Sequence, residues 1–198
     1  MPFRPVEEQM GAGAPVFRVY RSHRSAIEFN PNGSTASRAR FSPFGDPSVP
    51  TLYAASSETC AVSESLFHDV PILGGPLRPG AYLSAVMGLI RPTRDLNLAA
   101  LHGFASRRLG IDTTEVRTAE PNEYAQTATW GEAAHAAGFD GMVWMSKRYD
   151  SEKAYVFFGD RCADAFEQDN SFARAFALSA DLEWLIDLAA PLRIDVLI

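Results

Sequence analysis

The amino-acid sequence predicts a single domain of the α+β class. A chain of 198 residues has the length of one domain. Its content of 46% hydrophobic and 11% aromatic residues is typical of a globular protein with a substantial core. The predicted strands occur in runs and do not alternate strictly with helices, which favours the α+β class over a parallel α/β arrangement.

The first half of the chain shows strand patterns followed by a helix. Apolar and β-branched residues predict the strands, and a turn-rich segment separates the first two. Ser57 is a suitable N-cap for the helix, and Glu58 suits the positive end of the helix dipole. The expected elements are strands at 15–22, 39–43 and 51–55, a helix over about 58–70, a loop at 71–80 and a strand within 81–90.

The second half predicts helices, a hairpin and a closing strand. Gly110 and Gly138 stand where glycine ends a helix, and Pro121 falls near the first turn of the longer helix. The expected elements are helices at 102–110, 121–138 and 171–189, a hairpin of 141–146 with 153–159, and a last strand at 192–198.

Charge and cysteine content argue against several classes of protein. A formal charge of −6 disfavours a broad surface for nucleic acid or anionic lipid, although it leaves a local basic cleft open. Cys60 and Cys162 are too few for a disulfide framework, and the first residues lack the apolar run of a signal peptide. The longest apolar stretch, 81–90, is about half a membrane span. We therefore expect a cytoplasmic protein that contacts neither a membrane nor nucleic acid directly.

Common catalytic motifs do not occur in the sequence. The four histidines are scattered without metal-ligand spacing, so we expect no metal site. The run "GAGAPV" lacks the third glycine of a dinucleotide fingerprint and precedes a strand, and there is no phosphate-binding P-loop. Ser146 is not part of a G-x-S-x-G nucleophile elbow. A Rossmann enzyme, a kinase-like enzyme and a serine hydrolase are therefore disfavoured.

Two charged residues lie close to predicted apolar faces. Alternation along the first strand places Arg21 on the face of Phe17 and Val19, where a guanidinium either binds an anion or reaches to solvent. At about 100° per residue, Glu64 lies at the edge of an apolar arc on the predicted helix. Such a carboxylate is either functional or a boundary residue paired with a lysine or arginine. The arc comprises Cys60, Val62, Leu66, Phe67 and Val70.

Three further polar residues are weaker candidates. Ser146 ends a predicted strand on the face of Met142 and Trp144, where a serine is usually a turn or cap residue. Tyr124 and His135 fall on one face of the later helix, because eleven residues return the helical wheel to within about 20°. They either line a pocket or pack in the core or on the surface.

Several short blocks, in this order, resemble the RES domain family, which is named after an arginine, a glutamate and a serine. The blocks are "VYRSH", "FNPNG…ARFSPFG", "TLYAASSETCAVSES", "GFDGMVWMSKR" and "KAYVFFGDR". The three name-giving residues correspond to Arg21, Glu64 and Ser146. The resemblance covers 16–161, with a long insertion at about 77–121. It leaves 1–15 as an N-terminal tail and 162–198 as a C-terminal helical extension.

The resemblance implies a fold and a function. It implies an ADP-ribosyltransferase-like fold, with split antiparallel sheets and flanking helices. Family members are mostly toxins of bacterial toxin–antitoxin pairs that cleave the nicotinamide–ribose bond of NAD by hydrolysis or phosphorolysis, so NAD is a substrate and no cofactor is implied. The alternatives are a mono-ADP-ribosyltransferase that modifies a protein, or a non-catalytic module that binds NAD or a partner. The implied partner is an Xre-like antitoxin, and a homodimer stays open.

The same resemblance assigns roles to the candidate residues. Glu64 would face the positive charge that develops on the ribose, and Ser146 would either bind the substrate or orient Glu64. Arg21 and Arg40 would bind phosphates or ribose hydroxyls. Many members carry Gly-Gly-Arg-Trp where this chain has "SRARF", so Arg40 is the equivalent arginine. Tyr53 would stack on nicotinamide or orient the ribose.

Overall fold

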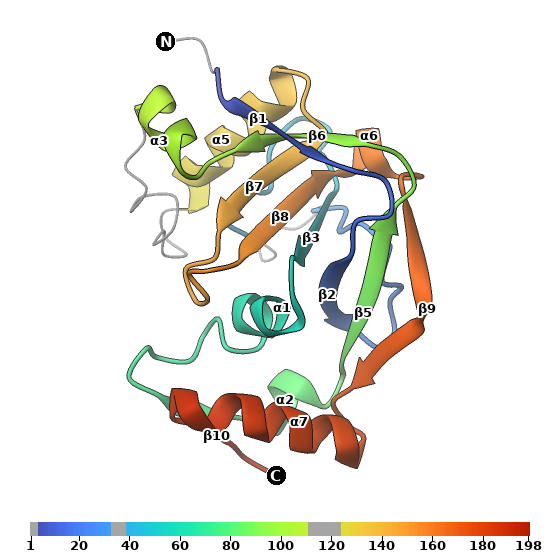
Figure 1. The fold of residues 1–198 in the computed structure, drawn as a ribbon, viewed down its shortest axis with the longest axis vertical. Helices are drawn as coiled ribbons and strands as arrows, with labels where there is room; N and C mark the ends of the chain where they lie inside the picture. Colours follow the sequence, from blue (N-terminus) through green and yellow to red (C-terminus); the bar gives the residue numbers. More distant parts are fainter. Residues whose placement is uncertain (1–3, 33–38, 111–123) are drawn as a thin grey trace.

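The structure is a computed structural model that describes residues 4–32, 39–110 and 124–198. Strands and helices are mixed along the chain, which confirms the predicted α+β class (Figure 1). The strands are β1 Val6–Met10, β2 Val16–Arg21, β3 Thr51–Ala55, β4 Gly75–Leu77, β5 Ala85–Pro92, β6 Leu96–Ala100, β7 Gly141–Met145, β8 Lys153–Phe158, β9 Phe166–Ala175 and β10 Ile194–Val196. The helices are α1 Glu58–Ser65, α2 Pro79–Tyr82, α3 Phe104–Leu109, α5 Tyr124–Ala136, α6 Gly159–Cys162, α7 Ser179–Ala189 and the short 3₁₀ helix Ala190–Leu192.

The described strands form one large sheet and one small sheet. The large sheet has the order β1-β6-β7-β8-β3-β2-β5-β9, and its pairs are antiparallel except for the parallel pair β6–β7. Strands β2 and β3 share only one residue pair, Phe17 with Ala55, whereas β2 runs beside β5 over its full length. The large sheet is therefore split between β2 and β3, as the resemblance implied. Figure 1 shows α1 on the open side of this split, between the β7–β8 hairpin and the helices α2 and α7.

Helix α1 begins where the sequence predicted but ends earlier. The Ser57 side chain accepts a hydrogen bond of 3.2 Å from the Cys60 N–H, so Ser57 is the predicted N-cap. The helix stops at Ser65, and 66–70 form turns. The Arg148 guanidinium donates to the backbone oxygens of His68 and Val70, so it holds the turns that follow α1.

The predicted apolar arc of α1 and the following turns is confirmed. All five arc residues are buried, and they belong to a core cluster that includes Phe176 and Leu185 near the C-terminus. Burying a valine, leucine or phenylalanine side chain stabilises the fold by about 2 kcal/mol. This packing holds α1 against the sheet and so positions Glu64 at the edge of the buried face.

Several predicted elements are wrong. Residues 39–43 form a tight turn, in which Ala39 pairs with Ser42, and not a strand. The predicted helix 171–189 begins only at Ser179, because 171–175 belong to β9. β9 is an edge strand with a mostly polar sequence, so hydrophobic alternation could not reveal it. Residues 6–10, expected in a tail, form β1, and β6 was not predicted. The loop 71–80 contains β4 and the start of α2.

The other helices and the hairpin agree with the sequence. Helix α3 ends at Gly110, whose φ of 66° is left-handed, and Gly138 with a φ of 94° follows α5. Strands β7 and β8 form the predicted hairpin. Pro121, in the first part of the predicted helix 121–138, lies outside the described residues. Cys60 and Cys162 are buried and unpaired, and burial raises the pKa of each thiol to about 12.

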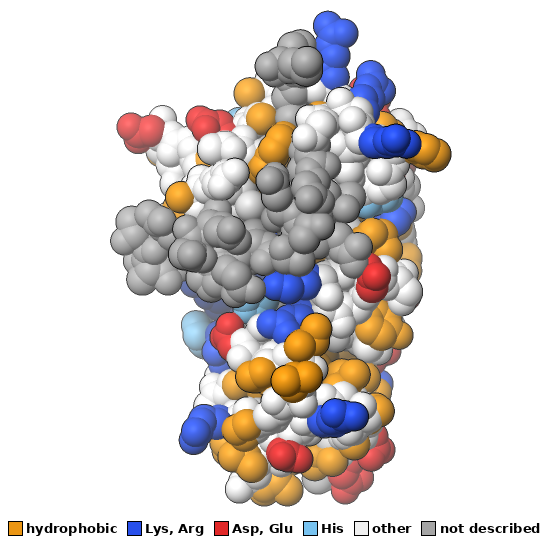
Figure 2. Space-filling model, turned by 90° about the vertical axis from the view of Figure 1, so that its left-hand side faces the viewer, with side chains coloured by type: hydrophobic (Ala, Val, Ile, Leu, Met, Phe, Trp, Pro, Cys, Tyr) orange, Lys and Arg blue, Asp and Glu red, His pale blue; other side chains and the backbone are white. Residues whose placement is uncertain are grey.

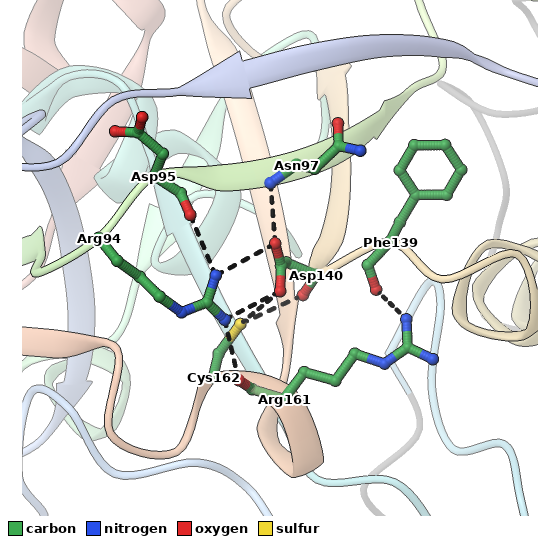
Figure 3. A network of polar contacts seen from close by, with 7 residues as sticks. All are labelled: Arg94, Asp95, Asn97, Phe139, Asp140, Arg161 and Cys162. Carbon is green, nitrogen blue, oxygen red and sulfur yellow. Dashed lines mark hydrogen bonds and ion pairs between the residues drawn. The ribbon is translucent and has the colours of Figure 1, made fainter.

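Asp140 joins three elements at the end of the molecule opposite α7. Its carboxylate accepts hydrogen bonds from Arg94 (2.9 Å) and from the Asn97 backbone N–H (2.8 Å), while Arg94 also donates to the Arg161 carbonyl (Figure 3). Burial alone would raise the pKa of Asp140, but these two hydrogen bonds and the positive charges of Arg94 and Arg161 hold the pKa below its usual value. The network therefore stabilises the junction of β6, β7 and α6 as long as Asp140 is ionised.

We expect Asp140→Asn to lower the free energy of unfolding at pH 7 by about 1–3 kcal/mol, because two charge-assisted hydrogen bonds are weakened. A carboxyl group with a depressed folded-state pKa stabilises the fold above its unfolded pKa of about 3.9, and this contribution is lost as pH falls through the folded-state value. The deficit of the variant should therefore shrink as urea unfolding is repeated from pH 7 toward pH 3. Asp187→Asn, at an exposed position of α7, is the control. A deficit independent of pH would contradict this assignment.

The surface carries both charged and hydrophobic side chains. On the face in Figure 2, hydrophobic side chains gather over the lower part of the molecule, with Lys and Arg side chains above and among them. Large exposed hydrophobic residues include Ile72, Leu73 and Leu192. Within the described residues, every helix is too short or too polar to cross a membrane.

Candidate active site

A cavity of about 640 Å³ opens at the split between β2 and β3. β2 and β3 supply two of its walls, α1 and the turn after it supply another, and Tyr124 at the start of α5 also lines it. The two strands diverge after a single shared pair, and residues of both strands line the space that opens between them. The cavity thus lies where the fold brings together several residues that the sequence predicted for the site.

Glu64 lies in this cavity and is held by the end of β7. Its Oε1 accepts a hydrogen bond of 2.5 Å from the Ser146 hydroxyl and another of 3.1 Å from the Lys147 N–H. Glu64 is half-buried on the edge of α1, as the helical wheel predicted. One carboxylate oxygen is therefore fixed by these two donors, which orients the whole group.

Ser146 is a hydrogen-bonding centre and not an exposed nucleophile. Its side chain is fully buried. Besides donating to Glu64, its Oγ accepts from the backbone N–H groups of Arg148 (3.2 Å) and Tyr149 (2.9 Å). Two predicted site residues thus come together, and the geometry favours the orienting role over direct contact with a substrate.

Arg21, the third name-giving candidate, lies at the rim. Its side chain is exposed and donates to Ser84 Oγ (2.8 Å) and to the Ala81 carbonyl (3.3 Å), next to β5. It lines the cavity, but among the described residues its hydrogen bonds go to Ala81 and Ser84 and not to Glu64 or Ser146. The structure therefore places Arg21 near the other two residues without joining it to them.

Arg18 is a cavity residue that the sequence reasoning missed. It is buried, lines the cavity, and donates a hydrogen bond of 2.6 Å to the Ala26 carbonyl. Burial lowers its pKa to about 10, so it is still a cation at neutral pH. The sequence analysis considered only the strand face of Phe17 and Val19, which carries Arg21, and Arg18 lies on the other face by alternation. A signal was present, however, because an arginine in the middle of an apolar strand needs an anion or a carbonyl.

Tyr53 and Arg40 also line the cavity. The Tyr53 hydroxyl accepts from the Phe41 N–H (3.1 Å) and shares a hydrogen bond of 3.2 Å with Ser42, so it fixes the turn that replaced the predicted strand. Burial raises the pKa of Tyr53 to about 12, so it is a neutral phenol. Arg40 is buried, and its backbone oxygen accepts a hydrogen bond from Thr127 of α5. Both predicted binding residues therefore reach the cavity from rigid positions.

His68 and Tyr124 form a second polar pair in the cavity. His68 Nε2 lies 3.1 Å from the Tyr124 hydroxyl, and His68 Nδ1 lies 2.9 Å from Asp69 Oδ1. His135 does not join them: it packs between Phe44 and Phe158 and contacts Asp160 at 2.7 Å. Although Tyr124 and His135 were predicted on one face of the helix, Tyr124 lines the cavity and His135 contacts Asp160 outside it.

The cavity is basic although the chain is acidic. Glu64 is the one carboxylate among the described residues that line it. Its cationic or titratable lining comprises Arg18, Arg21, His23, Arg24, Arg40 and His68. Such a cavity suits a ligand with phosphate groups and a separate centre of positive charge that faces the carboxylate. Within the described residues, there is no cluster of three His, Cys, Asp or Glu side chains arranged to hold a metal ion.

Comparisons with known proteins agree with this architecture. The chain resembles a solved structure, the toxin in the crystal structure of the M. tuberculosis MbcT–MbcA toxin–antitoxin complex. The TM-score is 0.62 at 14% sequence identity, and the match covers 88% of this chain and 90% of the other. No curated protein matches the sequence significantly. The sequence profile of the RES domain matches residues 15–181. The chain therefore belongs to the RES domain family.

Proposed function

We propose that the protein is an NAD-cleaving enzyme that breaks the nicotinamide–ribose bond, with water or phosphate as the acceptor. The observation that carries this proposal is the oriented Glu64 carboxylate in a cavity that is also lined by four arginines. NAD offers a matching pattern, because its pyrophosphate is anionic and its nicotinamide–ribose end is cationic.

Cleavage of the nicotinamide–ribose bond requires a fixed negative charge near the ribose and no general acid. Nicotinamide leaves a cationic ring as a neutral molecule, so its departure requires no proton. The ribose becomes an oxocarbenium-like cation, and a preorganised carboxylate stabilises it. The bonds from Ser146 and Lys147 occupy Glu64 Oε1 and leave Oε2 for the ribose. Arg18 and Arg40 would bind the pyrophosphate deeper in the cavity, and Arg21 would bind it at the rim.

We also propose that the enzyme acts as the toxin of a toxin–antitoxin pair and is inhibited by an Xre-like protein antitoxin. Membership of the RES family and the fold shared with a chain of a toxin–antitoxin complex support this proposal. Induced expression in bacterial cells should arrest growth and lower cellular NAD. Co-expression of the adjacent reading frame should restore both.

Incubation of the purified protein with NAD tests the proposed reaction. Free nicotinamide together with ADP-ribose, or with phosphorylated ADP-ribose when phosphate is present, is the expected result. NAD labelled in its ADP-ribose part distinguishes the alternative. Label on a protein band, with nicotinamide released but no free ADP-ribose formed, would indicate a protein ADP-ribosyltransferase instead. If folded protein releases no nicotinamide, the proposed function is wrong.

Arg18→Gln should weaken substrate binding more than turnover. Loss of a charged hydrogen bond to the pyrophosphate corresponds to about 1.5–3 kcal/mol, or roughly a tenfold to hundredfold rise in KM for NAD. Arg107→Gln, on the exposed surface of α3, is the matched control. Steady-state nicotinamide release measures both constants. An unchanged KM in a folded Arg18 variant would exclude Arg18 from substrate binding.

A further inference from the structure

A second cavity, of about 280 Å³, lies between α1 and the chain around the start of β10. Ser63 and Phe67 line it on one side, and Leu192, Arg193 and Ile194 line it on the other. This α1–β10 cavity shares none of its lining residues with the candidate active site. It is therefore a separate space to which the chemistry described above assigns no role.

α1 and the turn after it form a wall of both cavities. Ala61, Glu64 and Ser65 line the candidate active site, whereas Ser63 and Phe67 line the α1–β10 cavity. Residues three or four positions apart share one side of a helix, so the two sets lie on different sides of it. Ser63 and Glu64 are consecutive residues that line different cavities.

The walls of the α1–β10 cavity are held in place by hydrogen bonds. The Gly75 N–H donates to the Arg193 carbonyl (3.0 Å), and Ile194 of β10 lies beside Gly75 of β4 in the small parallel sheet. On the other side, the Arg148 guanidinium lines the cavity and donates to the Val70 carbonyl (3.0 Å). The cavity is thus formed by the fold itself and does not need a ligand to shape it.

Most of the lining is apolar. Phe67, Val70 and Ile194 are buried, while Ile72 and Leu192 are exposed by 84% and 45% of their surface. The volume lies near the lower end of the roughly 300–1,000 Å³ of small-molecule sites. These properties suit a small hydrocarbon body that is covered on its inner side and meets apolar side chains at the opening.

The polar groups of the lining are cations and a hydroxyl. Arg148 and Arg193 line the cavity, and no carboxylate does so among the described residues. Within the same part of the chain, the Arg193 guanidinium has no hydrogen-bond or ion-pair partner. Ser63 is only 2% exposed, and its hydroxyl also has no partner there. Buried hydroxyls are normally satisfied, and arginine and serine donors together bind a carboxylate well.

We propose that the α1–β10 cavity is a binding site for a small amphipathic anion, a molecule with a hydrocarbon body and one carboxylate. The body packs against Phe67, Val70 and Leu192. The carboxylate accepts hydrogen bonds from the arginines and the serine of the lining, which gives the lone Ser63 hydroxyl a partner. This inference is independent of the proposed function, because it involves no step of NAD cleavage.

The proposed ligand would contact residues that support the candidate active site. The Arg148 backbone N–H donates to Ser146 Oγ (3.2 Å), and the Ser146 hydroxyl donates to Glu64 (2.5 Å). Arg148 therefore belongs to the lining of one cavity and to the hydrogen-bonded support of the other. Ligand binding and the Glu64 carboxylate share α1 and Arg148, although they occupy different cavities.

A titration of ¹⁵N-labelled protein with sodium octanoate, followed by the chemical shifts of the backbone amides, tests the site. Octanoate is kept below the concentration at which it forms micelles, and NAD is absent. We expect saturable shifts with one binding constant, largest at the amides of Ser63, Phe67 and Arg193. Octan-1-ol, which has the same body without the charge, should bind about tenfold more weakly, and octylammonium should show no saturable binding there.

Leu192→Asp removes an apolar contact at the opening and adds a negative charge, so the affinity for octanoate should fall by about tenfold or more. Leu192 is partly exposed, and the variant should therefore fold. Leu178→Asp is the matched control, because Leu178 is an exposed leucine outside the cavity. Leu178 is also the N-cap of α7, a position where aspartate is favoured. It should leave the affinity unchanged.

The other outcomes overturn the inference. Shifts that do not saturate would indicate an adventitious additive only, and saturable shifts confined to amides near Arg18 and Tyr53 would place the anion in the candidate active site. Equal affinity for octanoate and octylammonium, or wild-type affinity in Leu192→Asp, would contradict the assigned contacts. Sedimentation velocity that shows a wild-type dimer converted to a monomer by Leu192→Asp would identify this face as an interface between copies. Each of these failures leaves the proposed NAD cleavage untouched, because NAD is absent from the experiment.

Discussion

Glu64→Gln is expected to reduce nicotinamide release from NAD by on the order of 1,000-fold, which corresponds to about 4 kcal/mol of transition-state stabilisation. The substitution keeps the shape of the side chain and an oxygen that can accept from Ser146 and Lys147. What it removes is the negative charge that faces the ribose. The loss should appear mainly in kcat, because the charge is needed most when the sugar becomes cationic.

Glu183→Gln is the matched control, because Glu183 is exposed on α7, away from the cavity. Circular dichroism and urea unfolding should show that both variants fold as the wild type does. If Glu64→Gln retains wild-type turnover, the carboxylate does not stabilise the reacting sugar, and the proposed mechanism is wrong even if the protein cleaves NAD.

The sequence predicts those parts of the fold that follow from hydrophobic periodicity. The buried arc of α1, its Ser57 cap and the β7–β8 hairpin could be predicted because local patterns determine them. The edge strand β9 escaped because its sequence is polar and its pairing with β5 is a long-range property. The turns at 66–70 could not be predicted either, since the guanidinium that binds the His68 and Val70 carbonyls comes from Arg148, far along the chain.

The candidate site shows the same limit. Helical geometry placed Glu64 at an apolar edge, and the structure adds that Ser146 and Lys147 orient it. Alternation along β2 selected Arg21, whereas the buried cation of that strand is Arg18. A periodicity of two cannot tell which face of a strand will border a cavity, because the cavity arises only where β2 and β3 diverge.

Ser146→Ala should impair both stability and activity. The buried hydroxyl makes three hydrogen bonds, and its removal leaves two backbone N–H groups and the Glu64 carboxylate each without one partner. We expect the free energy of unfolding to fall by about 3 kcal/mol. Once freed, Glu64 would no longer be held toward the ribose, and turnover should fall by on the order of 100-fold at temperatures where the variant is folded.

Ser63→Ala, on α1, provides the control. Ser63 is also buried, but its hydroxyl has no hydrogen-bond partner among the described residues. Its removal should therefore change the free energy of unfolding by less than about 0.5 kcal/mol or increase it. Urea unfolding and nicotinamide release separate the two effects of Ser146. A destabilised Ser146 variant with full turnover would make Ser146 purely structural, whereas equal destabilisation by both substitutions would show that burial, and not the hydrogen-bonding centre, accounts for the loss.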